Sequence, residues 1–112
     1  MPIETWSENV LLVELMDDPQ FTDDLGALLE KIESEPVWDV VLNFQNVSFL
    51  NSSNIARLLE LRKLQVISHE RKLRLCAINT HVWGVFLTTA LDKIFDVHDD
   101  VATGLASLAV DA

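Results

Sequence analysis

The sequence is short of cysteine, glycine and basic residues, and each shortage excludes a class of function. The one cysteine, Cys76, cannot form a disulfide within the chain, which is typical of a protein from a reducing compartment. The three glycines lie far apart, so no glycine-rich loop for binding phosphates is present. Only 8 residues are Lys or Arg against 18 Asp or Glu, which gives a net charge of −10. Because nucleic acids and anionic membranes repel such a chain, we expect it to bind neither.

Long hydrophobic runs are also missing. No segment approaches the roughly 18 consecutive apolar residues of a transmembrane helix. The N-terminal residues have no basic start and no apolar run of the length found in signal peptides. We therefore expect a cytoplasmic protein that does not insert into a membrane. The 112 residues and the hydrophobic fraction of 49% predict a single globular domain spanning residues 1–112.

The sequence contains no pattern typical of a catalytic or metal site. His69, His81 and His98 are far apart, and none lies at ligand spacing from another or from Cys76. No Walker motif, nucleophile elbow or catalytic-triad spacing occurs. We expect no metal, no cofactor and no enzymatic activity. The alternative is an enzyme that uses Ser52 as its nucleophile, although no oxyanion-hole or base motif accompanies this serine.

The apolar pattern predicts an α/β fold with about five strands and about four helices in the order β-β-α-β-α-β-α-β-α. The strands are expected at residues 3–6, 10–15, 37–44, 72–78 and 94–97. A short turn between the first two strands predicts an antiparallel hairpin. Beyond this hairpin, strands alternate with helices, which favours parallel pairing with right-handed crossovers and hence a mixed sheet. The run Val40-Val41-Leu42 predicts a strand in the middle of that sheet.

Helical spacing of apolar residues predicts which faces of the helices are buried. A first helix begins near residue 21 and ends at Pro36, because proline cannot donate the next helical hydrogen bond. A second helix runs from about residue 52 to 68, a short third begins at residue 80 with Asn79 or Thr80 as its cap, and a last begins at residue 99 or 100. The expected buried residues of the first two helices are Phe21, Leu25, Leu28, Leu29, Ile32, Ile55, Leu58, Leu59 and Val66.

The most informative segment is the polar cluster Asn51-Ser52-Ser53-Asn54, which lies between a buried strand and the second helix. The start of a helix has unpaired backbone N–H groups and a partial positive charge, so it can hold an anion. A serine at this place can act as a helix cap, as a phosphorylation site, or as both.

Three segments together resemble the STAS domain family. The first is Val47-Ser48-Phe49-Leu50-Asn51-Ser52-Ser53-Asn54-Ile55, the second is Lys72-Leu73-Arg74-Leu75-Cys76-Ala77-Ile78, and the third is Ala90-Leu91-Asp92-Lys93-Ile94-Phe95. The third segment is similar to the Gly-Leu-Asp-Lys-Leu-Phe element of that family. The resemblance covers nearly the whole chain in order and in length, and it implies a STAS-like fold.

This family includes the anti-sigma-factor antagonists of bacteria, which regulate transcription. In them, the first serine of an Asp-Ser-Ser/Thr-Gly-Leu motif is phosphorylated by an anti-sigma factor with a kinase or ATPase fold. The resemblance places Ser52 at the phosphoacceptor position, with Ser53 as the second choice. Asn51 takes the place of the motif's Asp and Asn54 takes the place of its Gly.

The resemblance implies a phosphoprotein that acts in the cytoplasm by protein–protein interaction. We expect a contact surface for the anti-sigma factor at Asn51, Ser52, Ser53 and Asn54, adjoined by the loop residues Asp18, Gln20 and Phe21. Stand-alone STAS subunits also serve as adaptors of ABC phospholipid transporters and as scaffolds in stress signalling. The sequence leaves this alternative open, together with the oligomeric state.

Overall fold

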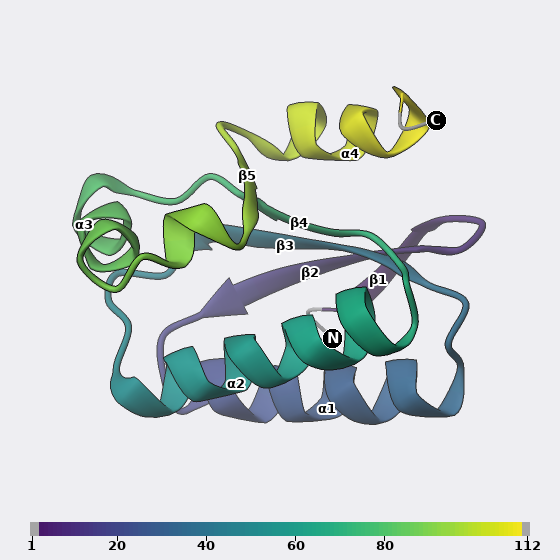
Figure 1. The fold of residues 1–112 in the computed structure, drawn as a ribbon, viewed down its shortest axis with the longest axis horizontal. Coiled ribbons are helices and arrows are strands. Elements are labelled where there is room, and N and C mark those ends of the chain that lie inside the picture. The colour runs from purple at the N-terminus through teal and green to yellow at the C-terminus, as the bar shows by residue number, and fades with distance from the viewer. Residues whose placement is uncertain (1–2, 111–112) are drawn as a thin grey trace.

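The five strands form one mixed sheet with helices on both of its faces (Figure 1). A computed structural model describes residues 3–110. The strands are β1 (Ile3–Ser7), β2 (Val10–Met16), β3 (Asp39–Asn46), β4 (Leu73–Cys76) and β5 (Asp96–His98), and they lie in this order across the sheet. β1 pairs with β2 antiparallel, and all other neighbours are parallel. The predicted element order, the hairpin and the central position of the third strand are confirmed.

The helices are α1 (Gln20–Ser34), α2 (Ser52–Arg62), α3 (Thr80–Thr88) and α4 (Val101–Val110). The predicted second helix differs from the expectation at its end, because α2 continues into a π-helical segment, η1 (Lys63–Ser68). A short 3-10 turn, η2 (Leu91–Lys93), precedes β5. Within η1, the buried Gln65 donates its Nε2 amide to Trp38 O at 2.6 Å and to Lys72 O at 2.9 Å. This amide ties the end of the helical segment to the chain around β3 and β4.

The main hydrophobic core lies between the sheet and the helices α1 and α2. All five predicted core residues of α1 are buried. At the centre, Phe44 of β3 makes edge contacts with Phe21 of α1 and with Phe86 of α3, at 6.1 and 6.2 Å between ring centroids. These contacts fix the position of α1 and α3 against the middle of the sheet.

The face of α2 is rotated from the one expected. Leu59 is 40% exposed, and Leu61 is buried in its place together with Leu58. Leu58 and Leu61 are three residues apart and lie on one side of the helix, whereas Leu59 is turned about 100° away from Leu58. The prediction of a buried Leu59 was therefore wrong.

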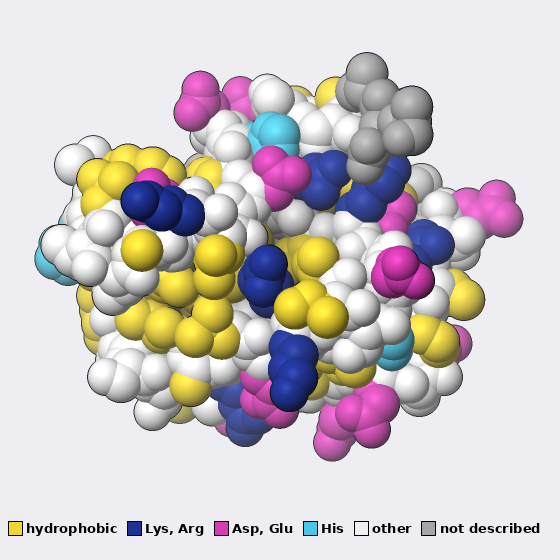
Figure 2. All heavy atoms as spheres, viewed as in Figure 1, with side chains coloured by type: hydrophobic (Ala, Val, Ile, Leu, Met, Phe, Trp, Pro, Cys, Tyr) yellow, Lys and Arg dark blue, Asp and Glu magenta, His cyan; other side chains and the backbone are white. Residues whose placement is uncertain are grey.

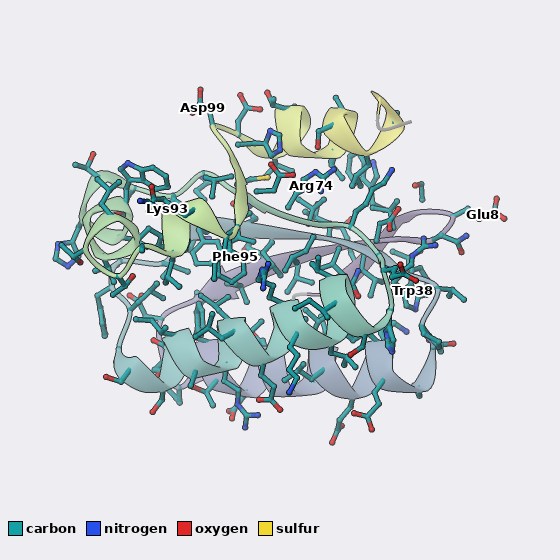
Figure 3. The ribbon with its side chains drawn as sticks, in the orientation of Figure 1. Glu8, Trp38, Arg74, Lys93, Phe95 and Asp99 are labelled. Carbon is teal, nitrogen blue, oxygen red and sulfur yellow. The ribbon has the colours of Figure 1, made fainter. Side chains whose placement is uncertain are left out.

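α4 covers the opposite face of the sheet, next to β3, β4 and β5 (Figure 1). Its first turn is capped by Asp100, whose Oδ1 accepts from Thr103 N at 2.7 Å. Gly104 faces the buried Cys76, and a Cβ atom at this glycine would overlap the Cys76 sulfur. His98 is the last residue of β5, and α4 begins at Val101. At the outer ends of the fold, Glu8 and Asp99 project away from the packed layers (Figure 3).

Candidate functional site

The two segments expected to form the contact surface lie side by side at one edge of the sheet. β2 and β3 are adjacent and parallel, and Met16 pairs with Asn46 at their ends. The loops that follow the two strands therefore leave the sheet at the same edge. Asp18 from the first loop and the turn at 51–54 from the second are joined by hydrogen bonds.

The turn itself is a reciprocal cap at the start of α2. Asn51 is the N-cap residue, in an extended conformation with φ −106° and ψ 176°. Its Oδ1 accepts from Asn54 N at 2.8 Å, and Asn54 Oδ1 accepts from Asn51 N at 3.1 Å. This arrangement satisfies two backbone N–H groups that would otherwise lack partners. The cap of this helix is therefore provided by the two asparagines and not by a serine hydroxyl.

Asp18 connects this cap to the start of α1. Its Oδ2 accepts from Asn51 Nδ2 and from Asn54 Nδ2, both at 2.9 Å. Its Oδ1 accepts from Thr22 Oγ1 at 2.8 Å and from Thr22 N at 3.0 Å. One carboxylate thus joins the N-termini of both helices that cover this face of the sheet.

These donors make Asp18 a strong acid. The hydrogen bond from the Asn51 amide is the largest cause that lowers the pKa of Asp18, from 3.8 to about 2, and the bonds from Asn54 and Thr22 act in the same direction. Partial burial opposes them. The carboxylate consequently stays ionised at neutral pH and places a negative charge beside the turn.

Ser52 and Ser53 are the first two residues of α2, and both are exposed. Within residues 3–110, neither hydroxyl makes a hydrogen bond to another residue. Asn51 and Gln20 are exposed as well, and Asp18 is partly exposed. The turn therefore presents hydroxyl and amide groups on a backbone that the cap holds in place.

Two residues expected at the contact surface are buried, which corrects the prediction. Phe21 is 0% exposed because its ring packs on Phe44 in the core. Asn54 is 1% exposed because its side chain bonds to Asn51, Asp18 and Thr22. The first residue belongs to the core, and the second supports the turn from beneath.

An exposed hydrophobic patch near the turn was missed by the sequence reasoning. Figure 2 shows hydrophobic side chains gathered on the face formed by α2 and the segment from α3 to η2. Leu59, Leu87 and Ile94 are 40%, 53% and 41% exposed. The spacing of the leucines did not reveal this patch, because it fits a buried face that contains Leu59 as well as one that contains Leu61.

Two other kinds of feature, a metal-binding cluster and a membrane-spanning helix, are not found within residues 3–110. Among residues 3–110, no group of three or more His, Cys, Asp or Glu side chains is placed to hold a metal ion. None of the helices in that range is both long enough and apolar enough to span a bilayer.

Comparison with known proteins identifies what this chain is similar to. A sequence model of the STAS domain matches residues 19–104. RsbS from Moorella thermoacetica, in a variant with one serine replaced by glutamate, superimposes with a TM-score of 0.82 at 17% identity, covering 96% of this chain and 93% of that chain.

Two further solved structures have the same fold. An anti-sigma-factor antagonist (STAS) domain protein from Planctomyces limnophilus gives a TM-score of 0.80 at 17% identity, covering 96% and 97% of the two chains. The Bacillus cell fate determinant SpoIIAA in its phosphorylated form gives 0.68 at 16% identity, covering 90% and 93%.

Proposed function

The chain belongs to the STAS domain family, and on this premise we propose that it is an anti-sigma-factor antagonist switched by phosphorylation of Ser52. In the unphosphorylated form it binds an anti-sigma factor that has a kinase or ATPase fold. The phosphorylated form does not bind the anti-sigma factor and is released from it. The observation that carries the proposal is the exposed Ser52 hydroxyl at the first position of α2, beside a helix cap that does not use it.

The contact surface consists of exposed groups around that hydroxyl. Asn51, Ser52, Ser53 and Gln20 form its polar part, and Asn54 and Asp18 hold the turn in place from below. A rigid turn loses little conformational entropy when a partner binds, which favours its use as a docking element. The hydrophobic patch around Leu59 extends this surface along α2 and gives it apolar area to bury.

Phosphorylation at Ser52 would act on the interface and not on the fold. It adds about −1.5 to −2 charges and three acceptor oxygens at a helix start. The helix dipole tolerates an anion there, with a favourable effect of roughly 0.3–1 kcal/mol. A partner surface pressed against the same turn has to desolvate that phosphate, which costs several kcal/mol if no cation meets it.

Position 51 is not acidic in this chain, but the Asp18 carboxylate lies beside it. The family motif has Asp where this chain has Asn51, so the charge next to the hydroxyl is not on the turn itself. Asn51 instead holds the Asp18 carboxylate at 2.9 Å through its amide. We infer that Asp18 supplies the negative charge that a kinase reads at this site.

The proposal is tested with the purified anti-sigma factor kinases of the host organism. Isothermal titration measures their affinity for the native chain and for Ser52→Ala and Ser52→Asp. We expect Ser52→Ala to bind like the native chain and Ser52→Asp to bind at least about tenfold more weakly, a difference of about 1.4 kcal/mol. Incubation with ATP should place one phosphate on native protein and none on Ser52→Ala.

A matched control tests whether the position of the added charge matters or only its presence. Ser68→Asp adds the same charge at the exposed end of η1, roughly 20 Å along the helical axis, and is expected to leave affinity unchanged. Ser53→Asp shows which of the two hydroxyls matters. Equal affinities for Ser52→Ala and Ser52→Asp would exclude the switch. If no kinase binds and a transporter ATPase does, the adaptor function replaces the antagonist function.

A further inference from the structure

The face of the sheet that carries α4 is only partly covered within residues 3–110. α4 lies against β3, β4 and β5, whereas α1 and α2 lie on the opposite face (Figure 1). No helix in that range packs over β1 and β2 on the α4 side. β2 is nevertheless an inner strand, paired with β1 at one edge and with β3 at the other. One face of an inner strand therefore has no helix packed on it.

The alternation of side chains along β2 shows which residues point to this uncovered face. Leu11, Val13 and Leu15 are buried in the main core, so the residues between them point the other way. Glu4 of β1 pairs with Leu12 of β2 and lies on the same face. The side chains on this face form what we call the β1–β2 strip: Glu4, Trp6, Val10, Leu12, Glu14 and Met16.

The strip is largely apolar and accessible. Trp6 is 54% exposed and Met16 is 46% exposed, and Leu12 of the inner strand is partly exposed. Trp6 also lines a hollow of about 240 Å³ together with Leu105 and Leu108 of α4. Apolar side chains of the hairpin and of α4 therefore face the same hollow, which runs beside the strip.

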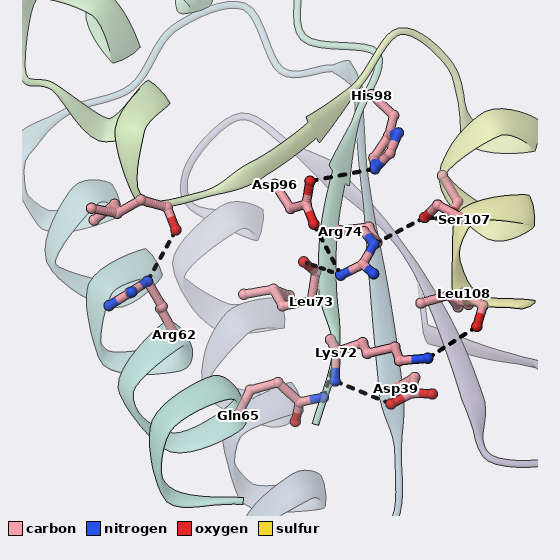
Figure 4. A network of polar contacts seen from close by, with 12 residues as sticks. Asp39, Arg62, Gln65, Lys72, Leu73, Arg74, Asp96, His98, Ser107 and Leu108 are labelled. Carbon is pink, nitrogen blue, oxygen red and sulfur yellow. Dashed lines mark hydrogen bonds and ion pairs between the residues drawn. The ribbon is translucent and has the colours of Figure 1, made fainter. Parts of the chain in front are cut away.

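α4 is held in its place over β3, β4 and β5 and does not cover the strip. Arg74 Nε donates to Ser107 Oγ at 2.9 Å, and Lys72 Nζ donates to Leu108 O at 3.0 Å (Figure 4). Gly104 approaches the sheet so closely that a Cβ atom there would overlap a buried side chain. These contacts tie α4 to β4 and its approach, so the space above β1 and β2 stays open beside it.

Two carboxylates give the strip a negative charge. Glu4 and Glu14 are both exposed, and neither makes an ion pair within the described part of the chain. Glu14 accepts only from the neutral amide of Asn46, at 3.4 Å. A symmetric dimer through this face would bring the two glutamates of each copy together, on chains that each carry a net charge of −10. The charge therefore favours a cationic partner over a second copy.

The dimensions of the strip match one helix. Two neighbouring strands about 4.8 Å apart present a surface roughly 10 Å wide, which is about the diameter of a helix with its side chains. The seven residues of β2 extend over about 23 Å, the length of roughly four helical turns. Packed helices lie about 8–10 Å apart, so a helix beside α4 would lie over β1 and β2.

We propose that the β1–β2 strip binds a cationic amphipathic helix of a partner protein. The apolar side of that helix packs on Trp6, Leu12 and Met16. Lys or Arg residues at the margin of its apolar side meet Glu4 and Glu14. The bound helix lies next to α4 and completes the layer on this face of the sheet. The strip excludes the turn at the start of α2, and the proposal does not depend on the function proposed for that turn.

The test uses a 15-residue peptide, an estimate from the length of β2, with Leu and Lys at helical spacing. A scrambled peptide of the same composition and a Leu/Glu peptide of the same spacing are the comparison probes. Titrations of the full chain are followed by amide and indole resonances in ¹H–¹⁵N NMR spectra. We expect saturable shifts centred on β1, β2 and the indole of Trp6 for the Leu/Lys peptide. Binding should weaken as salt concentration rises, and the scrambled peptide should bind at least about tenfold more weakly.

Variants on the two faces of the sheet provide matched controls. Glu14→Lys should weaken binding of the Leu/Lys peptide by about tenfold. Glu33→Lys makes the same change in net charge at an exposed position of α1, on the opposite face, and should weaken it by no more than about twofold. Trp6→Ala should also weaken binding, whereas Leu87→Ala, which truncates another half-exposed side chain on α3, should not. Circular dichroism checks that each variant is folded.

Five outcomes overturn the proposal. Equal losses in Glu14→Lys and Glu33→Lys would reduce the effect to attraction by net charge. A scrambled or Leu/Glu peptide that binds as well as the Leu/Lys peptide would remove the role of the amphipathic cationic helix. Shifts centred on α2 or α3, or no saturable binding, would exclude the strip. A native chain that sediments as a dimer through β1 and β2 would make a second copy the occupant. Binding to an anti-sigma factor is not a readout here, so this test and that of the switch can fail separately.

Discussion

The carboxylate of Asp18 should be a measurable source of stability, and Asp18→Asn is the substitution that tests it. The native carboxylate accepts four hydrogen bonds from Thr22, Asn51 and Asn54. An asparagine at this position keeps the size of the side chain but turns one acceptor oxygen into an N–H donor. That donor would face the donor amides of Asn51 and Asn54. The substitution therefore removes the link between the starts of α1 and α2.

The pKa shift of Asp18 sets the size of the stability loss expected for Asp18→Asn. It is lowered from 3.8 to about 2, mainly by the hydrogen bond from Asn51. Each pKa unit corresponds to about 1.36 kcal/mol, so the ionised form contributes at most about 2.4 kcal/mol to folding. The side chain is partly exposed, and screening by solvent reduces this to about 1 kcal/mol. We expect Asp18→Asn to lower the free energy of unfolding by about 1–2 kcal/mol at neutral pH.

The direction of the pKa shift determines how the stabilising contribution of Asp18 depends on pH. Because the pKa of Asp18 is lower in the folded chain than in the unfolded chain, its contribution is present above pH 3.8 and is lost as the pH falls towards about 2. The free-energy difference between native protein and Asp18→Asn should therefore be constant at neutral pH and should shrink over that acidic window.

Urea unfolding followed by circular dichroism at a series of pH values measures this difference. Asp23→Asn is the matched control, because Asp23 is an exposed acidic residue in the first turn of the same helix. Removing its charge from a chain of −10 should change stability by less than about 0.5 kcal/mol. Two results would refute the reasoning: equal stability of the two variants, or a native-to-Asp18→Asn difference that stays the same down to pH 2.

Two further predictions concern the opposite face of the sheet. Gly104→Ala should destabilise the chain by about 1–3 kcal/mol, because the added Cβ overlaps the Cys76 sulfur. A double-mutant cycle with Cys76→Ala in urea unfolding should show partial rescue, and additive effects would contradict the proposed overlap. Burial raises the pKa of the Cys76 thiol to about 11, so the folded chain should resist alkylation by iodoacetamide at about pH 8 while the unfolded chain reacts. Equal labelling rates of the folded and unfolded chain would show that Cys76 is accessible.

The order of the elements follows from local patterns in the sequence. The apolar run Val40-Val41-Leu42 specified a central strand, and the helical spacing from Phe21 to Ile32 specified the buried face of α1. Asn79 caps α3 through its Oδ1, which accepts from Val82 N at 2.9 Å. Each of these features depends on residues close to one another in the chain, so periodicity and capping chemistry were sufficient.

Other features depended on contacts that sequence spacing does not encode. The π-helical end of α2 accompanies the buried Gln65, which bonds to Trp38 and Lys72 across the fold. The rotation of α2 that exposes Leu59 and buries Leu61 depends on how the helix lies against the sheet. Neither the spacing of the leucines alone nor their helix propensity decided between these faces.

The features of the candidate site fall into the same two groups, those set by local sequence and those set by tertiary contacts. The sequence by itself determined that two hydroxyls stand at the start of a helix after a buried strand, because strand, turn and helix signals are all local. Only the tertiary structure decided that Asn51 and Asn54 form the cap, that Phe21 is buried, and that Asp18 reaches the turn from 33 residues away. The physical reason is that adjacent parallel strands bring their following loops together at one edge of the sheet, and hydrogen bonds formed there depend on strand order and register.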